Sequence, residues 1–130
     1  MDSKEDQFGN KGMKYRLTES FTFEAAHKIR KSKEEYGQLH GHSHQVFVTI
    51  VGEPHPTFGW ILEQSAFRSI VELYIQQLDH SFLNDRLTWV TAEGIANWLF
   101  RNLRGDFPKG VELESVKVHK TTTVAEVRND

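Results

Sequence analysis

The chain contains no cysteine, which excludes disulfides, thiolate metal ligands and cysteine nucleophiles. No apolar run approaches the roughly 18 residues that a membrane-spanning helix needs. Neither sign of charge is in large excess, because 16 Lys and Arg stand against 18 Asp and Glu. That balance gives no electrostatic footprint for nucleic acid or an anionic membrane. We therefore expect no nucleic-acid partner, no membrane partner and a reduced, cytoplasmic location.

The composition is that of one globular domain. The 130 residues are 38% hydrophobic and 12% aromatic, which suits a single core. Residues 1–13 are polar and carry glycine, so we expect a flexible N-terminal tail followed by one domain over residues 14–130. The unusual feature is the number of histidines, seven in all. Four of them lie in one short stretch: His27, His40, His42 and His44.

Apolar residues that alternate with polar ones indicate four strands. The expected strands are residues 15–23, 42–51, 113–120 and 124–128. Between the second and third strands, spacings of three and four indicate two helices. Ser65 is the expected cap of the first, which extends to Leu78. Thr91 is the expected cap of the second, which Gly105 and Pro108 end.

The order ββααββ predicts an α+β fold, a four-stranded antiparallel sheet with both helices on one face. Such a sheet has two open edges, and exposed edges need cover. A closed ring of several subunits would provide it. We therefore expect a homo-oligomer.

His40 and His42 flank Gly41 in an H-x-H pair, and residues i and i+2 of a strand point to the same face. Both imidazoles can therefore reach one ion, and His27, just past the first expected strand, is a candidate third ligand. Three imidazoles with an open fourth position are typical of a catalytic zinc site. Two alternatives stay open: most H-x-H pairs are ordinary surface residues, and His44 has the same parity as the pair.

Five motifs, in order, carry a resemblance to a known family. They are residues 21–27 (FTFEAAH), 39–42 (LHGH), 59–63 (GWILE), 78–84 (LDHSFLN) and 91–93 (TAE). From about Tyr15 onward the chain resembles the 6-pyruvoyltetrahydropterin synthase and 6-carboxytetrahydropterin synthase family. The resemblance implies the tunnelling fold, a ββααββ barrel closed by oligomerisation, here expected as a trimer-based hexamer with active sites between subunits.

The resemblance also assigns the metal. The family's three zinc ligands fall on His27, His40 and His42. His44 stands where the family usually has an aromatic residue, so it is expected in the pocket wall or as a residue that supports the zinc ligands from behind. Zinc as a Lewis acid would polarise the side-chain oxygens of a substrate.

Catalytic and substrate-binding residues follow from the same resemblance. Asp79 and His80 are expected to relay protons, because a carboxylate can fix the imidazole tautomer and support its charge. The alternative is that this pair only caps the end of the first helix. Thr91 and Ala92 match positions that line the pterin pocket.

Tyr36 marks the first departure from the family. It stands four residues before the first HGH histidine, where the synthases carry a catalytic cysteine, and Gly37 stands where a related branch carries a glutamate. A phenol has a reference pKa of about 10 and a thiol one of about 8.5. Tyr36 is therefore expected to be a poorer base at neutral pH unless zinc or a neighbour lowers its pKa.

Lys120, followed by Thr121, marks the second departure. The family has a glutamate at this position that pairs with the pterin amino and ring nitrogens, and an ammonium cannot accept those hydrogen bonds. Three interpretations are open. The substrate carries a carboxylate or phosphate that Lys120 binds; the chain has lost catalysis and kept the metal site and the assembly; or the alignment slips locally, and Glu126 or Glu114 is the anchor.

Trp60, Trp89 and Trp98 are expected as core or interface anchors. Trp89 replaces part of the Asn-Pro that usually precedes the Thr-x-Glu motif, so it is also expected to shape the pocket rim.

These observations predict a zinc-dependent enzyme of lyase or cyclase type that acts on a pterin-like or other small polar substrate. The alternative from another class is a non-catalytic family member that keeps zinc and the assembly for binding or scaffolding. A structural zinc module fits less well, because such a site closes with a fourth protein ligand, and only His44 offers itself.

Overall fold

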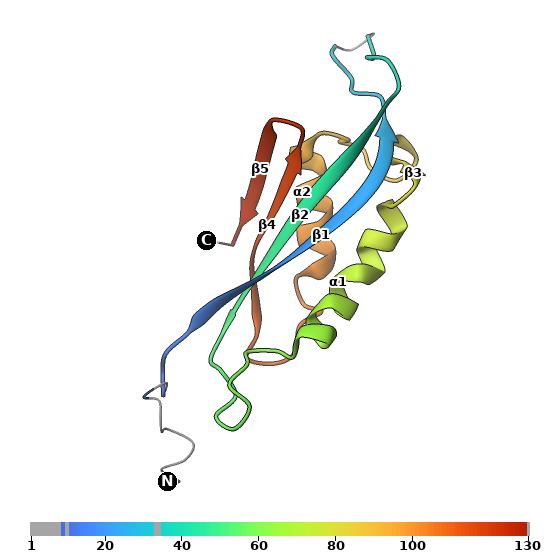
Figure 1. Cartoon of the computed structure of the whole chain (residues 1–130). Coiled ribbons are helices and arrows are strands. Elements are labelled where there is room, and N and C mark those ends of the chain that lie inside the picture. The colour runs from blue at the N-terminus through green and yellow to red at the C-terminus, as the bar shows by residue number, and fades with distance from the viewer. Residues whose placement is uncertain (1–8, 10, 33–34, 130) are drawn as a thin grey trace.

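The computed structural model describes residues 9, 11–32 and 35–129 (Figure 1). The elements in chain order are β1 (Tyr15–His27), β2 (His40–Gly52), α1 (Gln64–Leu78), β3 (Ser81–Phe82), the 3-10 helix η1 (Leu83–Asp85), α2 (Ala92–Leu103), β4 (Glu112–Lys120) and β5 (Thr123–Arg128). The predicted order is confirmed, with β3 and η1 added between the helices. Most of the predicted tail, residues 1–8 and 10, lies outside the described residues. None of the helices described is long and apolar enough to cross a bilayer.

The strands form one sheet in the order β3-β1-β2-β4-β5. Neighbouring strands are antiparallel except β3, which runs parallel to β1 over two residues. The prediction of four antiparallel strands is therefore wrong by one short strand, because two residues are too few to show alternation. Strands β1 and β2 are also longer than expected, since they pair from Tyr15↔Gly52 to His27↔His40. His27 is thus the last residue of β1 and does not lie beyond it.

The two helices begin at caps of different kinds. At α1 the prediction of Ser65 as the cap is wrong: Glu63 is the N-cap, and its carboxylate accepts from the Ser65 backbone N–H at 2.5 Å. A carboxylate here satisfies the helix N-terminus and adds a favourable charge. At α2 the predicted cap is confirmed, because the Thr91 hydroxyl accepts from the Gly94 N–H at 3.1 Å.

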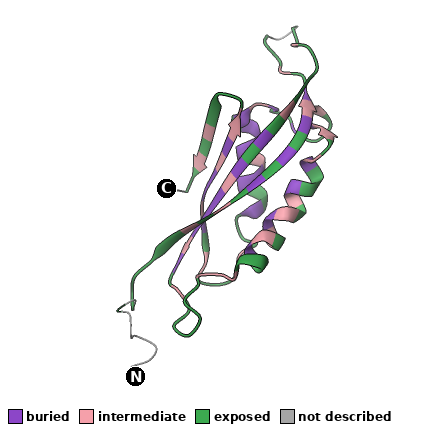
Figure 2. Ribbon diagram, in the orientation of Figure 1, coloured by how far each residue is buried: buried purple, intermediate pink, exposed green. Residues whose placement is uncertain are grey.

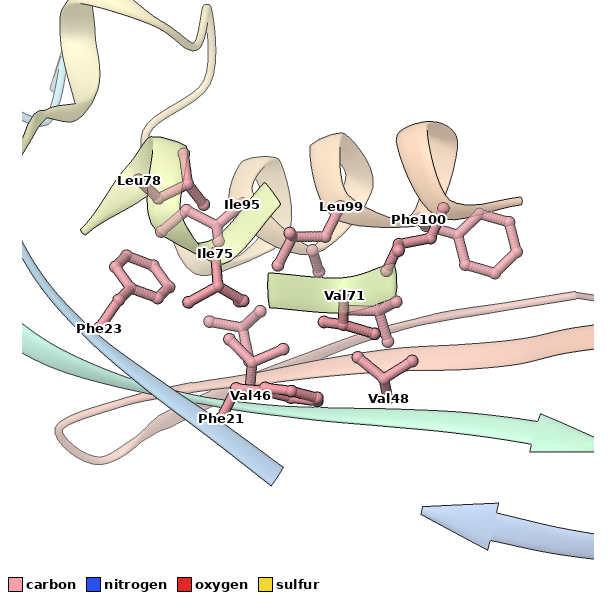
Figure 3. Close-up of a cluster of buried hydrophobic side chains, with 14 of the residues drawn as sticks. Phe21, Phe23, Val46, Val48, Val71, Ile75, Leu78, Ile95, Leu99 and Phe100 are labelled. Carbon is pink, nitrogen blue, oxygen red and sulfur yellow. The ribbon is translucent and has the colours of Figure 1, made fainter. Parts of the chain in front are cut away.

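Both helices cover the same face of the sheet, as predicted (Figure 1). Buried and exposed residues alternate along much of β1 and β2 (Figure 2). Successive side chains of a strand point to opposite faces, so the buried ones face the helices. The core between sheet and helices includes Phe21, Phe23, Val46, Val48, Val71, Ile75 and Leu99 (Figure 3). The same inward-facing rows continue into His27 on β1 and into His42 and His44 on β2. The sheet therefore brings the imidazoles together at one end of the core.

Candidate metal centre and the surrounding hollows

The histidines gather where the end of β1 pairs with the start of β2. The ring centroids of His27 and His42 are 5.0 Å apart, and those of His40 and His42 are 5.9 Å apart. Imidazoles bound tetrahedrally to one zinc ion at the usual Zn–N distance have centroids about 5 Å apart. Over the described ranges, no three His, Asp or Glu side chains already converge on a common point. The His27 and His42 rings have the spacing that two ligands of one ion would have, whereas the ring nitrogens of the three histidines do not converge in this structure.

His27 has a fixed tautomer. Its side chain is 1% exposed, and its Nδ1 lies 2.8 Å from the Val90 carbonyl oxygen. Because a carbonyl only accepts, Nδ1 carries the hydrogen, and Nε2 of the neutral ring has a lone pair. That buried Nε2 has no hydrogen-bond partner among the described residues. Burial lowers the pKa of His27, which keeps the ring neutral. A carbonyl that orients a histidine from behind is the usual support of a metal ligand.

His44 is buried beside this cluster. It is 1% exposed, and its ring stacks on Phe23 with centroids 4.6 Å apart and planes 7° from parallel. Neither ring nitrogen has a partner in the part of the chain that the structure describes. Burial lowers the pKa of His44 to about 4, so the ring is neutral at pH 7. The ring therefore packs on Phe23 as a neutral aromatic side chain would.

Lys120 lies at the edge of the cluster. It pairs with His44 across β2 and β4, is half-buried, and faces the same side of the sheet. Burial is the main reason why its pKa is lowered, and the Glu93 carboxylate opposes that shift. The Lys120 charge in turn contributes to the lowered pKa of His27 and His42. The site therefore contains an ammonium group, with a carboxylate from the first turn of α2 near it.

Neither alternative anchor lies with the histidines. Glu114 forms an ion pair with Arg16. Glu126 is opposite Lys117 on β4 and is exposed on the face that the helices leave open. The contacts of these two carboxylates give the interpretation of a local alignment slip no support.

Asp79 and His80 form a second polar group just after α1. Asp79 Oδ1 accepts from the Glu24 backbone N–H at 2.9 Å, and its Oδ2 lies 3.0 Å from His80 Nδ1. The Glu24 N–H is the main cause of the lowered pKa of Asp79. The carboxylate thus joins β1 to the imidazole, whereas only the backbone N–H of Asp79 caps α1. Asp79 is thus the C-cap of α1, as the capping alternative expected, and its carboxylate also lies within hydrogen-bond distance of the His80 ring, as a proton relay would need.

His80 is presented to solvent by unusual backbone. Its φ is 57°, and its N–H donates to the Glu24 carbonyl at 2.5 Å. A non-glycine residue in this region is uncommon and is often found where function demands it. The His80 side chain is 79% exposed, and it lines an open hollow of about 430 Å³ together with His42. This hollow connects a candidate zinc ligand with the candidate proton relay.

Tyr36 and Thr91 lie in a different hollow, of about 730 Å³. We call it the tyrosine groove; its lining includes Lys28, Arg30, Tyr36, Arg86, Trp89 and Thr91. Tyr36 is 55% exposed, and the Arg30 guanidinium lies 5.8 Å from its ring centroid. The groove adjoins the metal centre through its lining residue Val90, whose carbonyl holds His27. The structure therefore brings Tyr36 together with Thr91 and leaves both outside the hollow of His42 and His80.

The other two expected substrate-binding residues are less directly placed. Ala92 is 1% exposed, so its methyl group belongs to the core and only its backbone is left for a ligand. Thr121 is exposed in the turn between β4 and β5, where its hydroxyl donates to the Lys120 carbonyl at 2.7 Å.

Two supporting groups were not foreseen from the sequence. One is the Val90 carbonyl behind His27, and the other is the Glu24 backbone, which binds Asp79 and His80. Backbone groups leave no sequence signal. Trp89, expected as a core or interface anchor, is 66% exposed and is not in the core of this chain.

Comparison with known proteins gives the family. The family model described as 6-pyruvoyl tetrahydropterin synthase matches residues 16–130. The chain belongs to this family. It is 30% identical to the dihydroneopterin monophosphate aldolase of Pyrococcus furiosus over 82% of this chain and 90% of that protein. It is 32% identical to the 6-carboxy-5,6,7,8-tetrahydropterin synthase of Synechocystis over 84% and 88%.

The fold of the family is also found among solved structures. The 6-pyruvoyl tetrahydropterin synthase of Caenorhabditis elegans superposes with a TM-score of 0.79, covering 90% of this chain and 96% of that one. The two sequences are 21% identical, so this likeness speaks for the fold alone.

Proposed function

We propose that this family member is a zinc-dependent lyase that acts on a pterin or a closely related small molecule, with His27, His40 and His42 as the zinc ligands. One observation carries the proposal: the buried Nε2 of His27, in a tautomer fixed by Val90, has no hydrogen-bond partner among the described residues, and the His27 ring lies 5.0 Å from the His42 ring between centroids. Buried polar nitrogens are rarely left unpaired. A metal ion would satisfy this one.

Bound zinc would supply Lewis-acid polarisation of the substrate's side-chain oxygens. The chain's own residues would move the protons. Asp79 accepts from His80 Nδ1–H, so the exposed Nε2 of His80 can take a proton and pass it on. The positive charge formed on the ring is supported by the carboxylate, which the Glu24 N–H holds ionised. Tyr36, on a neighbouring groove, is the proposed third catalytic residue.

The substrate class is proposed from the relatives. Their names refer to reactions of dihydroneopterin monophosphate and of tetrahydropterins. Thr91, the Ala92 backbone, Lys120 and Thr121 are the proposed substrate contacts. Lys120 would bind an anionic or acceptor group, because an ammonium donates and does not accept. We further propose that the chain works in the cytoplasm as a homo-oligomer, a trimer-based hexamer, in which a neighbouring copy completes each site.

Metal content and turnover test this proposal separately. We expect about one zinc per chain by elemental mass spectrometry, and loss of that zinc in His27→Ala and His42→Ala but not in the control His80→Ala. We also expect cleavage or conversion of 7,8-dihydroneopterin phosphates, followed by liquid chromatography, to stop when a chelator is added. Zinc retained by His27→Ala would refute the ligand assignment.

The second candidate is a non-catalytic family member that binds ligands or serves as a scaffold. It is favoured by the exposed Tyr36 at the position of the family thiol and by Lys120 at the position of the family glutamate. Zinc at full occupancy without turnover of any dihydropterin phosphate would select it over the lyase.

A further inference from the structure

A hollow of about 610 Å³ shares Arg86 and Trp89 with the tyrosine groove and extends over α2. We call it the tryptophan groove; its lining includes Arg86, Trp89, Asn97, Trp98, Arg101 and Asn102. The volume is in the range of small-molecule sites. Neither Asp79 nor any histidine lines it. It is therefore separate from the candidate metal centre.

The charge of the tryptophan groove is entirely positive. Arg86 and Arg101 both line it, and no acidic residue does. Within the described part of the chain neither guanidinium forms an ion pair. The chain as a whole has a net charge of -2, so this local excess of positive charge is not a general property. Two arginines in one hollow favour an anion such as phosphate, which a guanidinium binds with two parallel hydrogen bonds.

The backbone that carries Trp89 is closely packed against α2. A Cβ on Gly94 would lie 2.0 Å from the Trp89 carbonyl oxygen, so only glycine lets the loop close this tightly on α2. The next carbonyl along, that of Val90, accepts from His27. The backbone beside Trp89 is thus fixed on two sides, yet 66% of the residue's surface is exposed. A large exposed indole on backbone that is fixed in this way is suited to stacking against a flat ring.

Two asparagine side chains in the lining of the tryptophan groove can form hydrogen bonds with a ligand. Asn97 and Asn102 carry amides that both donate and accept, which suits the edge of a heterocycle. Asn102 is anchored, since its Nδ2 donates to the Trp98 carbonyl at 2.7 Å. We propose that the tryptophan groove is a binding site for a flat heteroaromatic molecule that carries a phosphate group. Purine nucleotides and phosphorylated pterins share this chemistry.

Calorimetric titration of the full chain tests the site without any assay of turnover. The probes are GMP, 7,8-dihydroneopterin monophosphate, guanosine and inorganic phosphate, each with a chelator present to remove any metal contribution. We expect one of the two phosphorylated heterocycles to bind at least about tenfold more tightly than guanosine or phosphate alone. The compound whose binding Arg101→Gln weakens identifies the source of the ligand.

Two matched substitutions locate the binding. Arg101 lines only the tryptophan groove, and Arg30 lines only the tyrosine groove. For GMP, which is not a proposed substrate, Arg101→Gln is expected to weaken binding about tenfold or more, and Arg30→Gln to leave it unchanged. Trp89→Leu is expected to remove the advantage over inorganic phosphate. The proposal is overturned if Arg30→Gln weakens binding and Arg101→Gln does not, if phosphate alone binds as tightly, or if nothing binds at about 1 mM.

Discussion

Acid should destabilise the metal-free protein in a window set by His44. The pKa of this buried ring is lowered from 6.5 to about 4. Between these pH values the unfolded chain binds a proton at this position and the folded chain does not. The contribution of the neutral His44 ring to the free energy of unfolding is therefore fully present above about pH 6.5 and is lost as the pH decreases towards 4. Each pKa unit corresponds to about 1.4 kcal/mol, so the loss from His44 is about 3 kcal/mol.

Urea unfolding between pH 7.5 and 4, with a chelator present, measures this loss. His44→Phe removes the titrating group and keeps a ring on Phe23, so the variant should lose about 3 kcal/mol less than the wild type across the window. Some loss should remain, because burial also lowers the pKa of His27 and His42. His55→Phe, at an exposed position outside the cluster, serves as the control. Equal pH dependence in wild type and His44→Phe would refute the reasoning.

Three further predictions concern backbone geometry and proton relay. Thr121→Gly should raise stability by about 1 kcal/mol in urea unfolding, because a β-branched residue at φ 50° is strained; an unchanged or lower midpoint contradicts this. Gly94→Ala should cost about 3 kcal/mol or more, because its Cβ would meet Trp89 backbone, whereas Gly41→Ala has open space; equal stabilities would show that the loop yields. Asp79→Asn should lower kcat about 100-fold and leave zinc content unchanged, and undiminished turnover would remove Asp79 from the relay.

Much of the fold was predictable because apolar periodicity is a local signal. The helix ending at Leu78 and the cap at Thr91 both follow from spacing and side-chain type. The extension of β1 to His27 could not be predicted from the sequence. Strands are recognised by alternating hydrophobicity, and here a polar imidazole occupies an inward-facing position. Strand β3 was missed because its pairing with β1 depends on the turn after α1, not on its own two residues.

The sequence predicted which residues form the candidate site better than it predicted which of them lie together in space. Strand parity placed His40, His42 and His44 on one face, which the register with β1 and β4 confirms. The separation of Tyr36 from the hollow of His42 and His80 could not be foreseen, since it depends on the path of the connection between β1 and β2. The resemblance to the family predicted the roles of the site residues. Their positions depend on backbone contacts, such as those of Val90 with His27 and of Glu24 with Asp79, which no sequence motif encodes.

The most direct test of the account is a crystal structure of the zinc-loaded protein with anomalous data collected at the zinc edge. We predict one anomalous peak per chain, about 2.0–2.1 Å from Nε2 of His27 and from one ring nitrogen each of His40 and His42. The His27 Nδ1–H should still donate to Val90. A peak bound through His44 in place of any of these ligands, or no peak at the end of β1, would contradict the account.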